Sequence, residues 1–247
     1  MSGEGSAGHL PAGLASAWGF THVGKRGPKP AHSVGQIVDA AAELADAGGF
    51  AALSMPRIAR QLGLTANALY RYVSSRDELM MLLADAGWGP PPDSLPTSGP
   101  WRAAVTAWTR AMIDRFAVRP WLLDVPIQGA PVTPNLLRWL EVLLTSLAGS
   151  GLSANDLLGC AILFDGYARN TASLTRSLKN SRTSPVEAAA AMEFLRPLLQ
   201  ERGYPLLSAI SAGGAYADDP EFADEEFGLE RILDGVEVLI ARRRPKV

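Results

Sequence analysis

The sequence predicts an all-α protein in which an N-terminal three-helix domain of helix-turn-helix type is followed by a larger helical domain. Three observations indicate this fold class. Apolar residues recur at helical spacing along most of the chain, strand-like alternation is almost absent, and Pro- and Gly-rich stretches separate the periodic segments. At 247 residues with 47% hydrophobic content, the chain can also bury a core larger than a three-helix domain requires.

The chain begins with residues 1–24, which are rich in Gly, Ala and Ser and for which we expect a disordered tail. This segment lacks the charged start, long apolar core and cleavage site of a secretory signal. A basic, proline-stiffened arm follows, with Lys25, Arg26 and Lys29 in the sequence KRGPKP. The arm opens the first domain, which we assign to residues 25–86.

Two short helices joined by a tight turn form the centre of this domain. Ser54 is a good N-cap for the first helix, and Gly63 can end it because glycine adopts positive φ without a Cβ clash. Thr65 is the next N-cap, and we expect a second helix of about two turns that ends near Val73. Helices this short are not stable alone, so they must pack on the amphipathic helix predicted over Val34–Ala47.

Charge is segregated along the same stretch. Between Ala51 and Arg76 the sequence contains no carboxylate, whereas acids line the preceding helix and resume at Asp77. A surface that faces DNA phosphates needs this segregation, because each neutralised phosphate releases counterions and a misplaced acid repels the backbone. The formal net charge of the whole chain is −2, so the attraction must be local. An ordinary solvated face would explain the arginines alone, but the arginines combined with helix-turn-helix spacing predict a DNA contact. The basic arm could add to this contact by reaching into the minor groove. The basic residues of the stretch are Arg57, Arg60, Arg71 and Arg76.

A dense set of motif residues spans this domain. It consists of Ser54, Ile58-Ala59, Gly63-Leu64-Thr65, Leu69-Tyr70, Tyr72, and Arg76 followed by Asp77-Glu78-Leu79. With these residues, the segment from about Ser33 to Asp85 resembles the DNA-binding domain of tetracycline-repressor-like (TetR-type) transcriptional regulators. The resemblance implies phosphate contacts from Ser54, Tyr70, Tyr72 and Arg76, and base or near-base contacts from Arg57, Thr65, Ala66, Asn67 and Arg71.

Direct base recognition is expected mainly from the front of the second helix. Asn67 is the best single candidate, because its amide can pair bidentately with adenine. Its alternative role is local, as a capping or turn residue near Thr65. Pro56 departs from the resemblance, since relatives often carry a base-reading polar residue at that position.

A helix and a Pro-rich segment connect the first domain to the second half of the chain. The helix is predicted over Arg76–Ala86, with acidic residues in its first turn, near the positive end of its dipole. Residues 87–100 contain five prolines and three glycines, and we interpret them as a junction between domains. Residues 101–247 are then a helical effector-binding and dimerisation domain. Helical spacing predicts helices in it over Trp101–Val118, Pro134–Ala148, Ser153–Leu178, Pro185–Arg202, Leu206–Ser211 and Asp224–Arg243.

Two of these helices have apolar faces that suggest a second copy of the chain as a partner. Two helices from each of two chains would close a four-helix bundle, and the last helix also looks like the closing helix of the tetracycline-repressor class, which dimerises in this way. The alternative is that both faces pack within one chain. The faces comprise Leu229, Ile232, Leu233, Val236, Leu239 and Ile240 in the last helix, and Leu157, Ala161, Phe164, Ala168 and Ala172 in the helix after Ser153.

The remaining helices could enclose a cavity for a small molecule, although such aromatic stripes are also typical of an ordinary core. All three histidines precede the helix-turn-helix segment, which argues against a metal-chelated ligand in the second domain. We therefore expect a mostly apolar, uncharged or weakly polar effector, with no metal or cofactor. The candidate effector-binding residues are Trp108, Met112, Phe116, Trp121, Gln128, Trp139, Phe164, Tyr167 and Asn170.

The interpretation that follows is a ligand-responsive transcriptional regulator, namely a repressor that binds a palindromic operator in double-stranded DNA as a homodimer and is released by its effector. A helical adaptor that binds a protein through the same face is the alternative. An enzyme fits less well, because the sequence contains no nucleophile elbow, phosphate-binding glycine loop, paired metal ligands or His-containing triad. No apolar run approaches the roughly 20 residues needed to cross a bilayer, and the single cysteine, Cys160, excludes an internal disulfide. We therefore expect a soluble, cytoplasmic protein.

Overall fold

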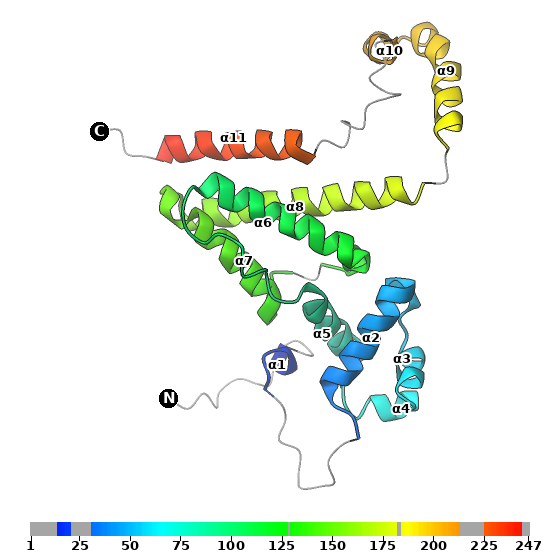
Figure 1. The fold of residues 1–247 in the computed structure, drawn as a ribbon, viewed down its shortest axis with the longest axis vertical. Coiled ribbons are helices and arrows are strands. Elements are labelled where there is room, and N and C mark those ends of the chain that lie inside the picture. The colour runs from blue at the N-terminus through cyan, green and yellow to red at the C-terminus, as the bar shows by residue number, and fades with distance from the viewer. Residues whose placement is uncertain (1–13, 21–30, 128, 182–183, 213–224, 244–247) are drawn as a thin grey trace.

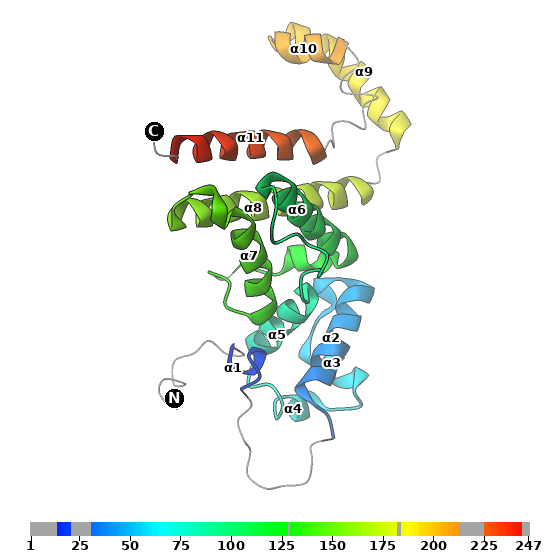
Figure 2. The ribbon, with the colours of Figure 1, turned by 60° about the vertical axis from the view of Figure 1, so that its left-hand side comes forward.

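The computed structural model describes residues 14–20, 31–127, 129–181, 184–212 and 225–243, and within these ranges all regular structure is helical (Figure 1). The all-α fold class is therefore confirmed. The first domain lies at the end of the molecule opposite the α9–α10 pair (Figures 1 and 2). Its elements are α2 (Val34–Gly48), η2 (Phe50–Ala52), α3 (Met55–Gln61), α4 (Ala66–Leu69) and the connecting helix α5 (Arg76–Trp88).

Local capping interactions set the helix starts in the first domain. The side chain of Ser54 accepts a hydrogen bond from the backbone N–H of Arg57, and the Thr65 hydroxyl accepts one from Ala68 at 3.2 Å. Gly63 has φ +68° at the end of α3, and the adjacent Leu64 N–H reaches back to the Ala59 carbonyl at 2.8 Å. This is the Schellman pattern, which satisfies carbonyls that the helix end leaves open. The predicted boundaries of α3 are thereby confirmed.

The second short helix is shorter than the sequence predicts. The expectation of a helix to about Val73 is wrong, because α4 ends at Leu69. The backbone N–H groups of Arg71 and Tyr72 bond to carbonyls three residues earlier, so the chain after Leu69 forms a 3₁₀-type turn. The tightened turn still buries Val73, which is 1% exposed. Tyr70, Arg71 and Tyr72 consequently lie on a turn immediately after α4 and not on its helical face.

The core of the first domain joins α2 to both short helices. Ile37 and Ala41 of α2, Ile58 of α3 and Leu69 of α4 are all completely buried. Full burial of each large aliphatic side chain stabilises the fold by about 1.5–3 kcal/mol, which short helices cannot gain alone. Gln61 of α3 also donates to the Glu43 carboxylate of α2 at 2.6 Å. Packing on α2 therefore fixes the orientation of α3 and α4.

The second domain is a bundle in which α6 and α8 pack together, α7 lies beside both, and α11 runs antiparallel along α8 (Figures 1 and 2). The helices α9 and α10 pack on each other and project from this bundle. No helix in the described ranges is both long and apolar enough to cross a membrane. The elements are α6 (Trp101–Val118), η3 (Pro120–Asp124), α7 (Pro134–Leu147), η4 (Ala148–Ser150), α8 (Ala154–Lys179), α9 (Pro185–Glu201), α10 (Pro205–Ala212) and α11 (Glu225–Arg243).

The apolar faces assigned to a partner chain are largely used within this chain. Arg102 of α6 forms ion pairs with three carboxylates along α11 and so holds that helix against the bundle. The expectation that these faces are left open for a second copy is wrong for most of their residues. Those buried in the single chain are Ala161, Phe164, Ala168 and Ala172 of α8 and Leu229, Leu233, Val236 and Ile240 of α11.

The two domains share one continuous core. Trp88, at the end of α5, is 5% exposed and makes edge contacts with the rings of Phe116 and Trp139. The Trp139 indole donates to the Gly89 carbonyl at 3.1 Å, which ties the start of the Pro-rich segment to α7. The junction expected over residues 87–100 therefore begins inside the core, and α5 extends two residues into it.

Part of the expected disordered tail is structured. Residues 14–17 form the short helix α1, which packs against α5. The Ser16 hydroxyl donates to the Glu78 carboxylate at 2.9 Å, and the Trp18 indole donates to the Val132 carbonyl at 2.9 Å. The expectation of a disordered tail is thus wrong for residues 14–20, whereas residues 1–13 and 21–24 lie outside the described ranges.

Candidate nucleic-acid interface and effector region

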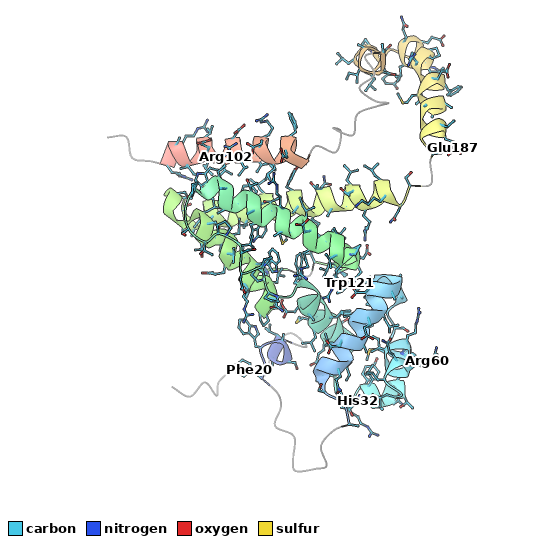
Figure 3. All side chains as sticks on the ribbon, viewed as in Figure 1. Phe20, His32, Arg60, Arg102, Trp121 and Glu187 are labelled. Atoms are coloured by element: carbon cyan, nitrogen blue, oxygen red, sulfur yellow. The ribbon has the colours of Figure 1, made fainter. Side chains whose placement is uncertain are left out.

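The turn and short helices of the first domain expose most of the residues predicted to contact DNA. Arg57 of α3, Asn67 of α4 and Arg71 of the following turn are all exposed, and Tyr70 is 46% exposed. Ala66 and Tyr72 are half-buried, and Ser54 and Thr65 accept backbone hydrogen bonds as helix caps. Each capping hydroxyl keeps its own proton available for a phosphate oxygen. Figure 3 shows Arg60 on the same domain, at the outer edge of the molecule.

The arginines of this surface have no carboxylate partners among the described residues. Arg57, Arg60, Arg71 and Arg76 are exposed, and none forms an ion pair there. In contrast, arginines elsewhere in the chain pair repeatedly with acids, as Arg102 does with α11. Four unneutralised guanidinium groups on and around the short helices create a local positive field, although the net charge of the chain is negative.

Of the two acids that follow Arg76, Asp77 is exposed and Glu78 is buried. Glu78 is only 7% exposed and accepts hydrogen bonds from Ser74 and Ser16. The acids of α2 lie on its exposed side, where Glu43 bonds to Gln61. The predicted arm residues Lys25, Arg26 and Lys29 lie outside the described residues.

The predicted effector residues fall into two groups. Six of them pack together in the core of the second domain, each at most 3% exposed. Their polar atoms already have partners within the chain, since the Trp108 indole donates to the Trp139 carbonyl at 2.8 Å. Two surface grooves in the described part of the chain are lined by other side chains. The six are Trp108, Met112, Phe116, Trp121, Trp139 and Phe164.

The remaining predicted effector residues lie elsewhere. Tyr167 packs against α11 at Gly228, where an added Cβ would come within 2.7 Å of the tyrosine ring. Asn170 is exposed on α8, and Gln128 lies outside the described residues. Cys160 is buried, and burial raises the pKa of its thiol, as expected of a small apolar core residue.

The short helix η3 connects the effector region to the first domain, a role that the sequence did not reveal. The Trp121 indole on η3 donates to the Asp46 carboxylate of α2 at 2.6 Å. Arg119, just before η3, donates to the Ala86 carbonyl of α5 at 2.8 Å. On the other side of η3, Arg176 of α8 makes two 2.9 Å hydrogen bonds to the Asp124 carboxylate. The η3 segment therefore contacts α8 as well as α2 and α5, and Figure 3 shows Trp121 between the two domains.

Comparison with known proteins decides the family. Residues 37–81 match the family described as bacterial regulatory proteins of the tetR family, and residues 93–240 match the tetracyclin repressor-like C-terminal domain. The chain belongs to the tetR family. The resemblance drawn from the motif residues is thus confirmed, and this tetR-family protein is a helix-turn-helix transcriptional regulator and not an enzyme.

Relatives of this tetR-family protein match along most of its length. It is 34% identical over 245 residues to the HTH-type transcriptional repressor DrrR1 of Streptomyces coeruleorubidus, covering 96% of this chain and 89% of that protein. An HTH-type transcriptional regulator of Saccharopolyspora erythraea is 30% identical over 182 residues, covering 73% of this chain and 75% of that one.

Solved structures of similar proteins support the same assignment. The tetR-family protein ActR of Streptomyces coelicolor in complex with actinorhodin has a TM-score of 0.71 and 26% identity, covering 83% of this chain and 95% of that chain. Apo ActR has a TM-score of 0.69 and 27% identity, covering 87% and 100%. The shared architecture is an N-terminal helix-turn-helix domain followed by a helical C-terminal domain.

Proposed function

We propose that this protein is a ligand-responsive repressor that binds a palindromic operator as a dimer and leaves it when a small, mostly apolar effector binds. The observation that carries the proposal is the exposed, unpaired set Arg57, Arg60, Arg71 and Arg76 around the helix-turn-helix. Because these side chains have no carboxylate partner among the described residues, they are available to phosphates at no cost in broken ion pairs.

The residues around α4 divide into positioning and reading roles. Tyr70, Tyr72 and the caps Ser54 and Thr65 can donate to phosphate oxygens and so fix the register of the domain on the duplex. Asn67 projects from the start of α4 and is exposed, as a residue that reads an adenine edge must be. The full set of proposed DNA contacts is Ser54, Arg57, Thr65, Ala66, Asn67, Tyr70, Arg71, Tyr72 and Arg76, together with Lys25, Arg26 and Lys29 of the arm.

The outward side of α8 supports dimerisation, although through different residues from those the sequence indicated. Ile162 and Leu163 are 75% and 54% exposed on α8, and Phe227 is 63% exposed on the adjacent α11. Two glycines, Gly159 and Gly166, lie on the same exposed side in the middle of α8 with no atom within 4 Å of an added Cβ. Each weakens the helix by about 0.5–1 kcal/mol relative to alanine. Close approach of a second helix would explain both the glycines and the exposed apolar residues.

Effector control is supported by the connection through η3. The buried aromatic group of the second domain lies next to Trp121, which bonds to α2. A ligand that opens space within this group would move α8 or η3 and thereby change the angle of the first domain. In the DNA-bound state the two α4 helices of the dimer lie about 34–36 Å apart, to match successive major grooves. The effector favours a state with another spacing.

The similar proteins agree with this proposal. DrrR1 carries the name of a repressor, and ActR has been solved with actinorhodin and with (S)-DNPA. These ligands belong to ActR. For this chain they support only the general property that a helical C-terminal domain of this shape accommodates small organic molecules.

Selection of bound fragments from the source genome is the experiment that tests the proposal. We expect enrichment of an inverted repeat, with affinity that falls steeply as salt rises. If all four arginines of each of two chains contact phosphates, the slope of log affinity against log salt is up to about −7. A monomer with no salt-sensitive retention on any fragment would refute the proposal. A salt-insensitive complex with a protein would instead identify a helical adaptor.

A further inference from the structure

Arg169 on α8 has an unusual environment for a half-buried arginine. Its Nε atom is buried and has no hydrogen-bond partner, and no other buried side-chain nitrogen or oxygen in the described ranges is left in this state. The guanidinium carbon lies 5.0 Å from the centroid of the Phe116 ring, over its face. The nearest carboxylate, Asp165, is 3.9 Å from Nε, which is beyond hydrogen-bond distance.

Two other arginines of the second domain with similar exposure hold carboxylates by direct hydrogen bonds. The side chains of Arg102 and Arg176 are each 29% exposed, against 25% for Arg169. Arg102 bonds to three carboxylates of α11, and Arg176 holds Asp124 with two parallel hydrogen bonds. Arg102 and Arg176 therefore have carboxylate oxygens within hydrogen-bond distance, whereas Nε of Arg169 has none.

Asp165 is a weak partner for Arg169. Burial raises the pKa of the Asp165 carboxyl, and the nearby Arg169 offsets only part of that rise. Since burial disfavours the charged form of this carboxylate, it does not compensate the guanidinium fully. Asp165 therefore leaves the positive charge of Arg169 incompletely balanced.

We propose that Arg169 binds an anionic group, most simply a carboxylate, on an otherwise aromatic effector. The proposal rests on the ligand-responsive function above and specifies the class of ligand. A planar carboxylate matches the fork of guanidinium donors, including Nε. The ring system of the same molecule would lie against Phe116 and the neighbouring Trp88, whose rings already contact each other at 5.1 Å between centroids. This proposal of an aromatic acid differs from the mostly apolar, uncharged or weakly polar effector that the sequence suggested.

The position of Arg169 also connects such a ligand to the DNA-binding domain. Arg176 follows seven residues later, two helical turns along the same side of α8, and holds Asp124 of η3. A carboxylate that pulls Arg169 away from Phe116 would therefore act on the helix face that is tied to η3.

A matched pair of probes tests this assignment on the full-length protein. Anthracene-2-carboxylic acid and its primary amide have the same ring system and differ in charge at neutral pH. We expect isothermal titration to give an affinity for the acid at least about tenfold higher than for the amide. Arg169→Gln should remove this preference and leave the amide affinity unchanged. The control Arg110→Gln, which removes an exposed ion pair with Glu226 on the surface, should keep it.

Several outcomes would overturn the proposal. These are equal affinities of the unsubstituted protein for acid and amide, no binding of either, or an acid preference that survives in Arg169→Gln. Operator release is measured separately. An effector that releases DNA equally well from Arg169→Gln would leave the repressor function in place and refute the role of Arg169. Acid binding that requires Arg169 but does not release DNA would support the role of Arg169 and refute effector-controlled release.

Discussion

Gly87 gives the sharpest test of how the two domains are packed. It is buried near the end of α5, and an added Cβ would lie 2.4 Å from Cη2 of Trp121 and 2.8 Å from Cδ2 of Leu122. Both of these side chains are 2% exposed, and the Trp121 indole is held by Asp46. The neighbours therefore have little room to move when Gly87→Ala is introduced.

The magnitude follows from two opposing effects. Overpacking a tight core costs about 1–3 kcal/mol, whereas replacing a helical glycine by alanine gains up to about 1 kcal/mol. We expect Gly87→Ala to lower the free energy of unfolding by about 1–2 kcal/mol. In a Trp121→Phe background the outer ring carbons are absent and only the approach to Leu122 remains, so the same substitution should be less destabilising, by about 1 kcal/mol.

Chemical denaturation followed by far-ultraviolet circular dichroism, at fixed protein concentration, measures all four proteins of this cycle. Gly35→Ala is a control for the helical effect, because its nearest contact would be an ordinary 3.6 Å to the Ser33 hydroxyl. The reasoning is refuted if Gly87→Ala has the same effect in both backgrounds, since η3 would then not lie against α5.

Three further predictions concern DNA contact, dimerisation and pH. Tyr70→Ala should weaken binding to all DNA sequences, whereas Asn67→Ala should relax the preference at one base position at a cost of about 1–3 kcal/mol. Gel shift on a set of substituted operators measures both effects. A uniform loss of affinity from both variants would contradict the division of roles. Gly166→Leu should lower the dimer fraction in analytical ultracentrifugation, and Gly149→Leu, at an exposed position in η4, should not; equal behaviour would place the interface elsewhere. Hydrogen bonds from Arg102 and, second, from Arg231 hold the pKa of Asp234 below its ordinary value. The stability that this carboxylate adds is therefore fully present at pH values above the pKa of the unfolded state, and it is lost as the pH falls through the lowered pKa of the folded state. A thermal unfolding series in acid should show this loss in the unsubstituted protein and a smaller one in Arg102→Gln, and identical series would exclude the contribution.

Local features of the structure were predictable because they depend on neighbouring residues. The caps Ser54 and Thr65 and the positive φ of Gly63 follow from side-chain chemistry within a few positions. The limits of the long helices also follow from spacing and from Pro or Gly punctuation. The end of α4 did not, because Val73 is buried in the core through a tightened turn, and that burial depends on residues distant in sequence.

The composition of the candidate sites was only partly predictable. Spacing identifies which residues of α8 and α11 are apolar, but an amphipathic stripe is the same whether its partner is in the same chain or in another. The structure buries Phe164 and Leu233 within the chain and leaves Ile162 outside. Likewise, the sequence marks the aromatic residues of the second domain as large and apolar, but it could not show that the Trp121 indole bonds to Asp46.

By itself, the sequence determined the helical class, the helix-turn-helix and the carboxylate-free arginine surface, since each depends on residues that are close together in the chain. Only the tertiary structure decided which helix faces meet, that η3 joins α8 to the first domain, and that Nε of Arg169 has no hydrogen-bond acceptor while Arg102 and Arg176 hold carboxylates. Those features join residues tens of positions apart, and their energies depend on distance and burial. Neither quantity exists until the chain has folded.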